Sequence, residues 1–238
     1  ELILTYFSSG TTGAPKKFFH SHLSVLESAK NSKRFYNIGD TMLWRQDLSM
    51  NHFGILTTSI LPAMMFCDNI VIYDKLADNT RFFKSLSNHS IRIDTALILA
   101  HSRESLQPFR FLFNKEAKII TGGRNFAGEI YQAAKSTLLT NNCKIFNVYG
   151  CTELATPLMW RCLETNKSYT LEDFVTFDEH IEGLEIIPNE NGMIEGFKPH
   201  PVFFSDDEES LKIPDDIKID GNRHIFINRK QLMVFAPS

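Results

Sequence analysis

The sequence from Ser8 to Lys16 reads SSGTTGAPK, and this stretch decides how the rest of the chain is interpreted. It combines small hydroxyl side chains, glycines and a lysine within nine residues. Glycines let the backbone approach a ligand closely, and consecutive exposed N–H groups form an anion-binding concavity. The hydroxyls and the lysine add further donors. The stretch therefore predicts a loop that wraps a polyphosphate, with contacts from Ser8, Ser9, Gly10, Thr11, Thr12, Gly13 and Lys16.

Two other interpretations of this stretch are a P-loop and an ordinary polar turn. The common P-loop, G-x-x-x-x-G-K-[ST], fails on spacing because Pro15 stands five residues after Gly10 and no Gly-Lys-Ser/Thr follows. An ordinary polar turn would also use Gly, Ser, Thr and Pro. Apolar residues 2–7 precede the stretch and Phe18 and Phe19 follow it, so we expect a loop held between buried segments.

The bulk properties narrow the class of protein. The chain has 238 residues, of which 43% are hydrophobic, and this is enough to build a core. A net charge of −3 gives no electrostatic case for binding nucleic acid or an anionic membrane. No apolar run approaches the length of a membrane-spanning helix. Four cysteines without a C-x-x-C pair indicate reduced thiols and a cytoplasmic location.

Short apolar runs alternate with helical patterns over the first two thirds of the chain. The expected strands, which suit burial on both faces, are 70–73, 96–100, 118–121 and 145–148. The expected helices are 24–34, 55–65 and 126–139. This alternation predicts an α/β fold with a mostly parallel sheet flanked by helices.

After about residue 165 the helical periodicity fades. Short alternating segments separated by turn signals predict a small β-rich, barrel-like subdomain. Its expected strands are 184–187, 193–195, 202–204, 217–219 and 224–227. We therefore expect an α/β core over 1–165 that binds nucleotide and acyl group, and a β-rich subdomain over 166–238 that completes the nucleotide site.

A second polar motif follows the expected strand 145–148. Residues 147–153 read NVYGCTE, so Gly150 permits a tight turn and Thr152 and Glu153 present a hydroxyl and a carboxylate. Open α/β sheets bind ligands at the carboxyl ends of their strands. A carboxylate there, next to phosphates, would suit Mg²⁺. Alone, the motif is more typical of a simple strand-to-helix turn, in which the threonine is the N-cap and the glutamate lies in the first turn.

Together the two motifs resemble the signatures of the acyl-adenylate-forming superfamily, which includes acyl-CoA synthetases, aryl-acid ligases and nonribosomal adenylation domains. The first signature is T-S-G-T-T-G-x-P-K-G followed by a histidine, and Lys16 and His22 keep its spacing. Ser8 replaces its first threonine and Lys17 its last glycine. The second signature, Y-G-x-T-E, is intact. The resemblance implies that Tyr149 stacks on adenine, Thr152 contacts the α-phosphate and Glu153 binds magnesium.

Two weaker matches concern the adenine and the ribose. Gly122, Gly123 and Arg124 stand where the family has a turn that lines the adenine pocket, although the arginine departs from the pattern and a plain turn is equally possible. Residues 213–230 resemble a third signature, which would make Asp216 the aspartate that binds the ribose and Arg229 the arginine near a hinge. A surface hairpin is the alternative there, and the acidic run 205–210 is a rival position for the ribose aspartate.

Another weak match concerns the acid. Asn51, His52, Phe53 and Gly54 fall where the family has a substrate-pocket motif, although a histidine that opens a helix is often structural. These residues are closer to the aryl- or fatty-acyl-activating members, whereas Asp47 would suit the amino group of an amino acid. The sequence does not decide between these substrates.

The resemblance implies ATP-dependent activation of a small carboxylic acid as an acyl-adenylate. ATP and Mg²⁺ would be needed, and the acyl group would pass to coenzyme A or to the phosphopantetheine of an acyl carrier protein. The family's first hundred residues and its C-terminal lid, which supplies a lysine, are expected to be absent from these 238 residues. A catalytically inactive nucleotide-binding subunit, with a regulatory or scaffolding role, is the alternative.

Overall fold

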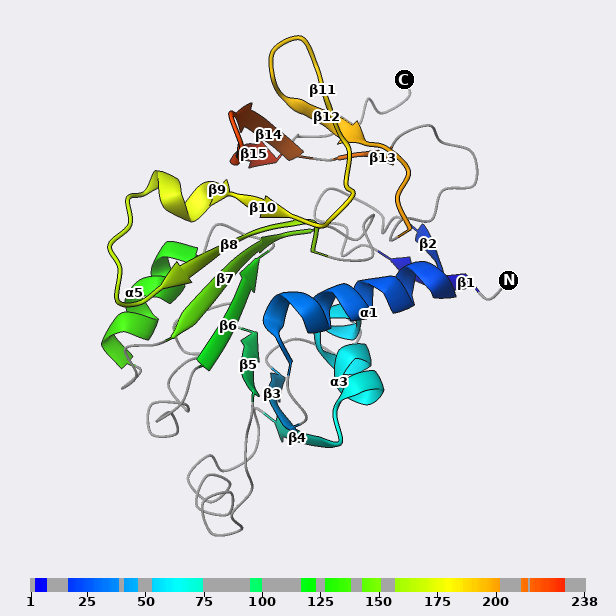
Figure 1. Ribbon diagram of the computed structural model, residues 1–238, viewed down its shortest axis with the longest axis vertical. Coiled ribbons are helices and arrows are strands. Elements are labelled where there is room, and N and C mark those ends of the chain that lie inside the picture. The colour runs from blue at the N-terminus through cyan, green and yellow to red at the C-terminus, as the bar shows by residue number, and fades with distance from the viewer. Residues whose placement is uncertain are drawn as a thin grey trace, which may run out of the picture.

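A computed structural model describes residues 3–7, 17–38, 41–46, 53–74, 95–99, 117–122, 127–137, 143–150, 157–201, 211–213 and 215–229. Strands and helices alternate along the first part of the chain, and strands dominate the last part (Figure 1). The α/β class predicted from the sequence is confirmed.

A seven-stranded mixed sheet forms the centre of the molecule, in the order β10-β8-β7-β6-β5-β3-β4. Its strands are β3 (Thr41–Gln46), β4 (Asn69–Asp74), β5 (Thr95–Leu99), β6 (Ala117–Gly122), β7 (Lys144–Tyr149), β8 (Met159–Glu164) and β10 (Glu179–His180). Neighbouring strands from β4 to β7 pair in parallel, whereas β8 pairs antiparallel with β7 and β10 antiparallel with β8. The four runs predicted as buried strands are β4, β5, β6 and β7.

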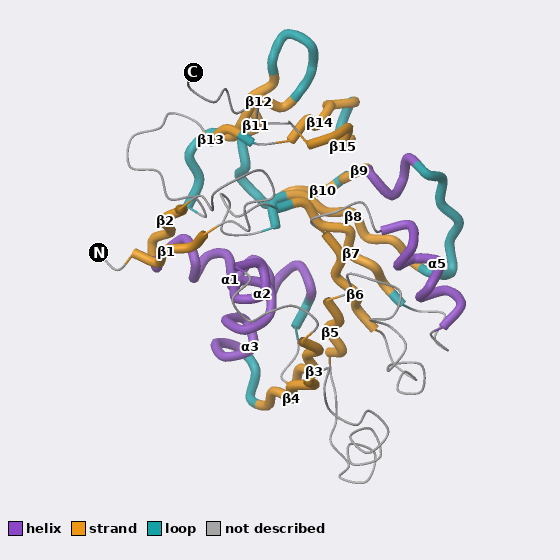
Figure 2. The backbone as a smooth tube through the Cα atoms, turned by 180° about the vertical axis from the view of Figure 1, so that it is seen from behind, coloured by secondary structure: helices purple, strands orange, loops and turns teal. Residues whose placement is uncertain are grey.

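Helices cover both sides of this sheet (Figures 1 and 2). They are α1 (His22–Tyr36), a continuous helical run made of α2 (Phe53–Ile55), the π-helical η1 (Leu56–Ile60) and α3 (Leu61–Phe66), and α5 (Ala127–Thr137). The Ser21 side chain caps the start of α1 by accepting from the Ser24 N–H. Lys118 is a buried residue of β6, and its Nζ donates to the Tyr36 and Asn37 carbonyls at the C-terminal end of α1. These bonds tie β6 to α1.

The first two strands form a hairpin apart from the large sheet. β1 (Ile3–Phe7) and β2 (Lys17–Ser21) pair antiparallel. Leu4 and Tyr6 pack with Val25 of α1, so one face of the hairpin is covered. Phe7 and Phe19 are 61% and 46% exposed, which corrects the expectation that both flanks of the first loop are buried. An isolated pair of strands has only one face to bury, and these two rings lie on the other.

The C-terminal part is β-rich, as expected. Its elements are η3 (Glu172–Val175), β9 (Thr176–Phe177), β11 (Ile186–Pro188), β12 (Ile194–Phe197), β13 (Leu211–Lys212), β14 (Asp215–Asp220) and β15 (Arg223–Arg229). They form two antiparallel three-stranded sheets, β11-β12-β13 and β14-β15-β9. The expected strand 202–204 lies outside the described residues. β10 returns to the large sheet after residue 165, and the division into 1–165 and 166–238 stays a prediction.

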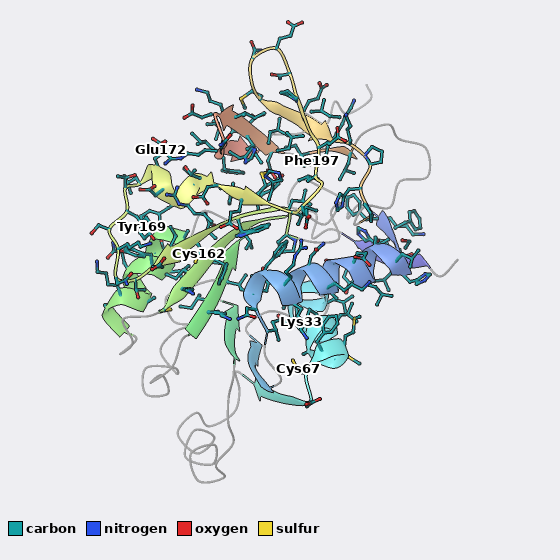
Figure 3. All side chains as sticks on the ribbon, in the orientation of Figure 1. Lys33, Cys67, Cys162, Tyr169, Glu172 and Phe197 are labelled. Atoms are coloured by element: carbon teal, nitrogen blue, oxygen red, sulfur yellow. The ribbon has the colours of Figure 1, made fainter. Side chains whose placement is uncertain are left out.

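One apolar core joins the large sheet to the C-terminal strands. Tyr36 and Phe146 meet edge to face, with ring centroids 5.4 Å apart. The same cluster continues through Phe177 and Ile217 to the fully buried Phe197, which Figure 3 labels beside the upper strands. Among the described residues, no helix is long and apolar enough to cross a membrane.

Candidate functional site

The predicted phosphate loop joins the two strands of the first hairpin. Residues 8–16 lie outside the described residues, but the residues on either side are described. Phe7 and Lys17 are direct partners in the β1–β2 ladder, so they close the base of the loop. The chain after Lys17 continues as β2 and reaches α1 only at His22, which is exposed. A P-loop leads straight from loop to helix, so this order further disfavours that alternative.

The second motif also joins two antiparallel strands. Tyr149 is the last residue of β7 and pairs with Met159, the first residue of β8. The Leu158 N–H donates to the Tyr149 carbonyl over 2.8 Å, and this bond closes the base of the connection. Gly150 follows at the carboxyl end of β7, where the sequence predicts a ligand site. Thr152 and Glu153 lie in 151–156, outside the described residues.

Tyr149 is held by the C-terminal sheet. Its hydroxyl donates to Asp215 Oδ2 of β14 over 2.8 Å, and both residues are only 6% exposed. Its ring lies against Phe177 of β9, with centroids 5.9 Å apart. The end of β7 is therefore fixed by a polar and an apolar contact from residues 28 or more positions away in the sequence.

Asp215 rather than Asp216 makes this contact. Burial alternates along β14, so Asp215 and Ile217 face the core while Asp216 is half-buried on the other side. The structure thus brings Tyr149 together with Asp215, whereas the sequence match points to Asp216. The signal was present, because the apolar Ile217 sits two residues after Asp215 and shares its face. Arg229 ends β15 directly opposite Asp215 in the ladder, and its side chain lies outside the described residues.

Gly122 marks a close approach of β6 to β7. A Cβ atom at this position would lie 2.5 Å from the Val148 carbonyl oxygen, so a side chain cannot fit without backbone movement. The sequence placed this glycine in an adenine-lining turn, whose other members, Gly123 and Arg124, lie outside the described residues. The observed tight approach accounts for one glycine of that turn through packing alone.

A buried polar row crosses one face of the large sheet next to this turn. Thr121, Asn147 and Arg161 are register partners on β6, β7 and β8. Asn147 Nδ2 donates to the Phe174 carbonyl over 2.8 Å, which ties β7 to η3. Within the part of the chain that the structure describes, the buried Thr121 hydroxyl has no hydrogen-bond partner.

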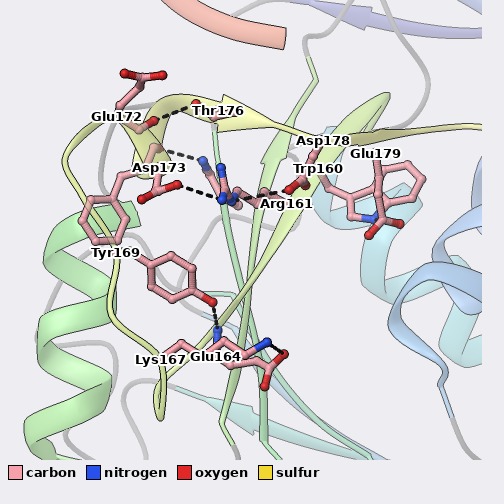
Figure 4. Close-up of polar contacts among 12 residues, drawn as sticks. Trp160, Arg161, Glu164, Lys167, Tyr169, Glu172, Asp173, Thr176, Asp178 and Glu179 are labelled. Carbon is pink, nitrogen blue, oxygen red and sulfur yellow. Dashed lines mark hydrogen bonds and ion pairs between the residues drawn. The ribbon is translucent and has the colours of Figure 1, made fainter. Parts of the chain in front are cut away.

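Arg161 extends this row into an ion-pair network, drawn in Figure 4. Its guanidinium pairs with Asp173 at 2.8 Å and with Asp178 at 3.6 Å. The Thr170 backbone N–H and hydroxyl both donate to Asp173, and with Arg161 nearby they hold the pKa of this carboxyl below its ordinary value. The network fixes β8 to η3 and to Asp178, the residue between β9 and β10.

The predicted acid pocket is described only in part. Phe53 and Gly54 begin α2, whereas Asn51 and His52 lie outside the described residues. The Gly54 carbonyl accepts from the Thr58 hydroxyl, which sits in the π-helical turn η1. The described residues contain no cluster of three His, Cys, Asp or Glu side chains that could hold a metal ion. Glu153, the expected magnesium ligand, is not among them.

Comparison with known proteins identifies the family. The sequence matches the family described as AMP-binding enzyme over residues 1–175. The chain belongs to this family. No match was found among curated proteins.

Several solved structures of AMP-binding enzymes share its fold. O-succinylbenzoate coenzyme A synthetase (MenE) from Bacillus subtilis, in complex with ATP and magnesium ion, is 16% identical with a TM-score of 0.67, and the match covers 94% of this chain and 49% of that one. A variant of E. coli MenE with bound OSB-AMS is 17% identical with a TM-score of 0.64, covering 94% and 48%.

An acyl-CoA synthetase (AMP-forming)/AMP-acid ligase II-like protein from Dyadobacter fermentans is 16% identical with a TM-score of 0.62, covering 96% of this chain and 60% of that one. The chain therefore spans about half to three fifths of the length of these proteins. At this level of identity the likeness shows the fold alone.

Proposed function

We propose that this chain is the core of an enzyme that activates a carboxylic acid with ATP, forming an acyl-adenylate. The observation that carries the proposal is the intact Y-G-x-T-E motif at the end of β7, in a chain of the AMP-binding family. The hairpin loop 8–16 supplies the second signature of that chemistry. Both motifs occupy loops that close on paired strands, a geometry suited to presenting donors and a carboxylate to a ligand.

The proposed reaction needs positioning and charge neutralisation rather than a protein nucleophile. The substrate carboxylate attacks the α-phosphorus of ATP, and pyrophosphate leaves. Thr11, Thr12 and Lys16, with their backbone amides, would hold the β- and γ-phosphates. Thr152 would contact the α-phosphate, and Glu153 would hold Mg²⁺, which offsets charge on the phosphates.

The remaining nucleotide contacts in the proposal come from three other parts of the chain. Tyr149 would present its ring to adenine, and residues 122–124 would line the same pocket. Asp216 would bind the ribose hydroxyls with Arg229 nearby, because these two positions match the family's third signature. The role of Asp216 rests on this sequence match alone, since the residue of β14 that contacts Tyr149 is Asp215.

The most specific part of the proposal concerns the identity of the acid and of the acyl acceptor. Residues 51–54 would line the pocket for a fatty or aryl acid. The thiol of coenzyme A is the favoured acceptor, because the similar structures include coenzyme A synthetases. The phosphopantetheine of an acyl carrier protein is the alternative thiol, and it has the same reactive end.

The test is ATP–pyrophosphate exchange by the intact gene product over a panel of fatty, aryl and amino acids. We expect exchange that depends on one class of acid and on Mg²⁺. Lys16→Ala and Glu153→Gln should each lower the exchange rate by about a hundredfold, the cost of removing one charge-stabilising group. Lys17→Ala is the matched control, because the Lys17 ammonium lies over the Phe19 ring on the exposed hairpin.

The same assay separates the catalytic proposal from its alternative. Binding of ATP or AMP without exchange for any acid would identify a nucleotide-binding subunit instead. The off-pattern residues Lys17, Arg124 and Asn228 are the features that favour this second candidate. Absence of both binding and exchange would contradict both functions.

A further inference from the structure

We infer that Asp215 is a positioning residue of the nucleotide site, which acts through the hydroxyl of Tyr149. The inference rests on the proposed function and deepens it. It assigns to Asp215 a role separate from the ribose contact proposed for Asp216. The geometry behind it is the buried hydrogen bond between the end of β7 and the first residue of β14.

The contact joins two sheets at the point where the site is built. Tyr149 ends β7, one residue before the turn that leads to Thr152 and Glu153. Asp215 begins β14, in the separate three-stranded sheet β14-β15-β9. Their 2.8 Å hydrogen bond, together with the apolar core that joins the two sheets, holds the C-terminal sheet against the end of β7.

Burial makes this bond hard to replace. Tyr149 and Asp215 are each 6% exposed, so water has little access to either group when the bond is broken. A buried hydroxyl or carboxylate that loses its partner carries a desolvation cost larger than the net value of an ordinary hydrogen bond. Asp215 therefore stabilises the one orientation of the Tyr149 side chain in which this hydrogen bond forms.

The ring of Tyr149 has few other orientations available. Phe177 of β9 contacts it from the same C-terminal sheet, at an interplanar angle of 51°. One sheet thus supplies both a polar anchor for the hydroxyl and an apolar wall for the ring. A tyrosine held at its hydroxyl and at its ring is preorganised. A nucleotide that packs against the ring then binds without the entropic cost of ordering that side chain.

Asp216 and Asp215 can serve the site in different ways because strand alternation separates their side chains. Asp215 shares the core-facing side of β14 with Ile217, and Asp216 lies on the other side. Loss of a residue that contacts the ribose should weaken the binding only of a nucleotide that carries the ribose hydroxyls. Loss of a residue that acts through Tyr149 should weaken the binding of nucleotides with and without these hydroxyls, and this difference gives a test.

The experiment measures the affinity of the intact protein for AMP and for 2′,3′-dideoxy-AMP by isothermal titration calorimetry. The variants are Tyr149→Phe, Asp215→Ala, Asp215→Asn and the double variant Tyr149→Phe with Asp215→Ala. Asp220→Asn is the matched control, since this aspartate is on the same strand and exposed. Thermal melting of each variant reports whether it folds.

We expect Tyr149→Phe and Asp215→Ala each to weaken binding by roughly tenfold, equally for both nucleotides. The double variant should be no weaker than either single variant, because both remove the same bond. Asp215→Asn, which keeps an acceptor oxygen, should stay within about twofold of wild type. Should Asp215→Ala fail to fold, Asp215→Leu, which removes the acceptor but fills a similar space, takes its place with the same expected loss.

Three results would overturn the inference. They are wild-type affinity in Asp215→Ala, losses that add in the double variant, and a loss that disappears with the dideoxy nucleotide. The last would make Asp215 itself the ribose contact. Failure of the wild-type protein to bind AMP at all would instead refute the proposed function, and the inference would fall with it.

Discussion

The two loops that carry the family signatures rest on different supports. The loop 8–16 closes on the Phe7–Lys17 pair of a two-stranded hairpin, where both residues are exposed. The loop after Tyr149 closes on Leu158 and Met159, which are fully buried in the core. A hairpin of two strands is marginally stable by itself, whereas a core strand shares the stability of the whole domain.

This difference matches what each loop has to do in the proposed reaction. Apart from Lys16, the first loop would hold a polyphosphate by many interchangeable amides and hydroxyls, and these do not each need an exact position. A single carboxylate that holds a metal ion must be placed accurately, and accurate placement needs a rigid support. We therefore expect substitutions beneath the second loop to affect the whole fold and those beneath the first to have local effects.

The largest contrast is expected at the bases of the two loops. Leu158→Ala removes a fully buried side chain and should lower the free energy of unfolding by about 2–5 kcal/mol. Phe7→Ala removes a ring that is 61% exposed and should cost less than about 1 kcal/mol. Chemical denaturation of the two variants measures both values. Equal losses would show that the hairpin and the core support their loops alike.

A smaller loss of stability is expected from Gly122→Ala on β6. The new methyl group would lie 2.5 Å from the Val148 carbonyl, and relieving this clash should cost about 1–3 kcal/mol. Gly128→Ala is the comparison, since there the nearest atom belongs to the side chain of Phe174 at 3.3 Å and can shift. A Gly122 variant as stable as the Gly128 variant would contradict the tight approach of β6 and β7.

Acid should weaken the C-terminal support through His224. Burial, and the nearby His180 ring, lower the pKa of His224 in the folded protein. The unfolded chain therefore takes up a proton first, and stability is lost as the pH falls below about 6.5 toward the lowered value. His224→Gln should flatten the pH dependence of the unfolding free energy in this window. An unchanged slope would show that the buried imidazole does not contribute.

The smallest effect is expected from Asp173, at lower pH. Hydrogen bonds from Thr170 and the charge of Arg161 lower its pKa in the folded state. Its contribution is therefore present above about pH 4 and is lost as the pH falls through the lowered value. Asp173→Asn should reduce stability at neutral pH and remove part of the acid dependence. Urea denaturation at several pH values would reveal whether the wild type and the variant converge in acid.

Part of the fold was accessible from the sequence because several of its strands are continuous apolar runs. Such runs mark β4, β5, β6 and β7, and an apolar periodicity marks the helices. β3 and β8 were not predicted, since charged residues such as Arg45 and Arg161 interrupt their apolar pattern.

The candidate site is indicated by the sequence only through local motifs. The Y-G-x-T-E signature located the end of β7, but nothing in it indicates a partner 66 residues away. Two adjacent aspartates in β14 look equivalent in sequence, and strand phase alone separates Asp215 from Asp216. Contacts between distant segments depend on how two sheets dock, and local patterns do not encode that docking.

The most direct test of the central claim is a crystal structure of the intact protein with Mg²⁺ and α,β-methylene-ATP, which cannot release pyrophosphate. We predict that residues 8–16 contact the β- and γ-phosphates while the Glu153 carboxylate meets the same ligand through the metal ion. A triphosphate bound by one of these loops, with the other loop facing away from it, would contradict the account.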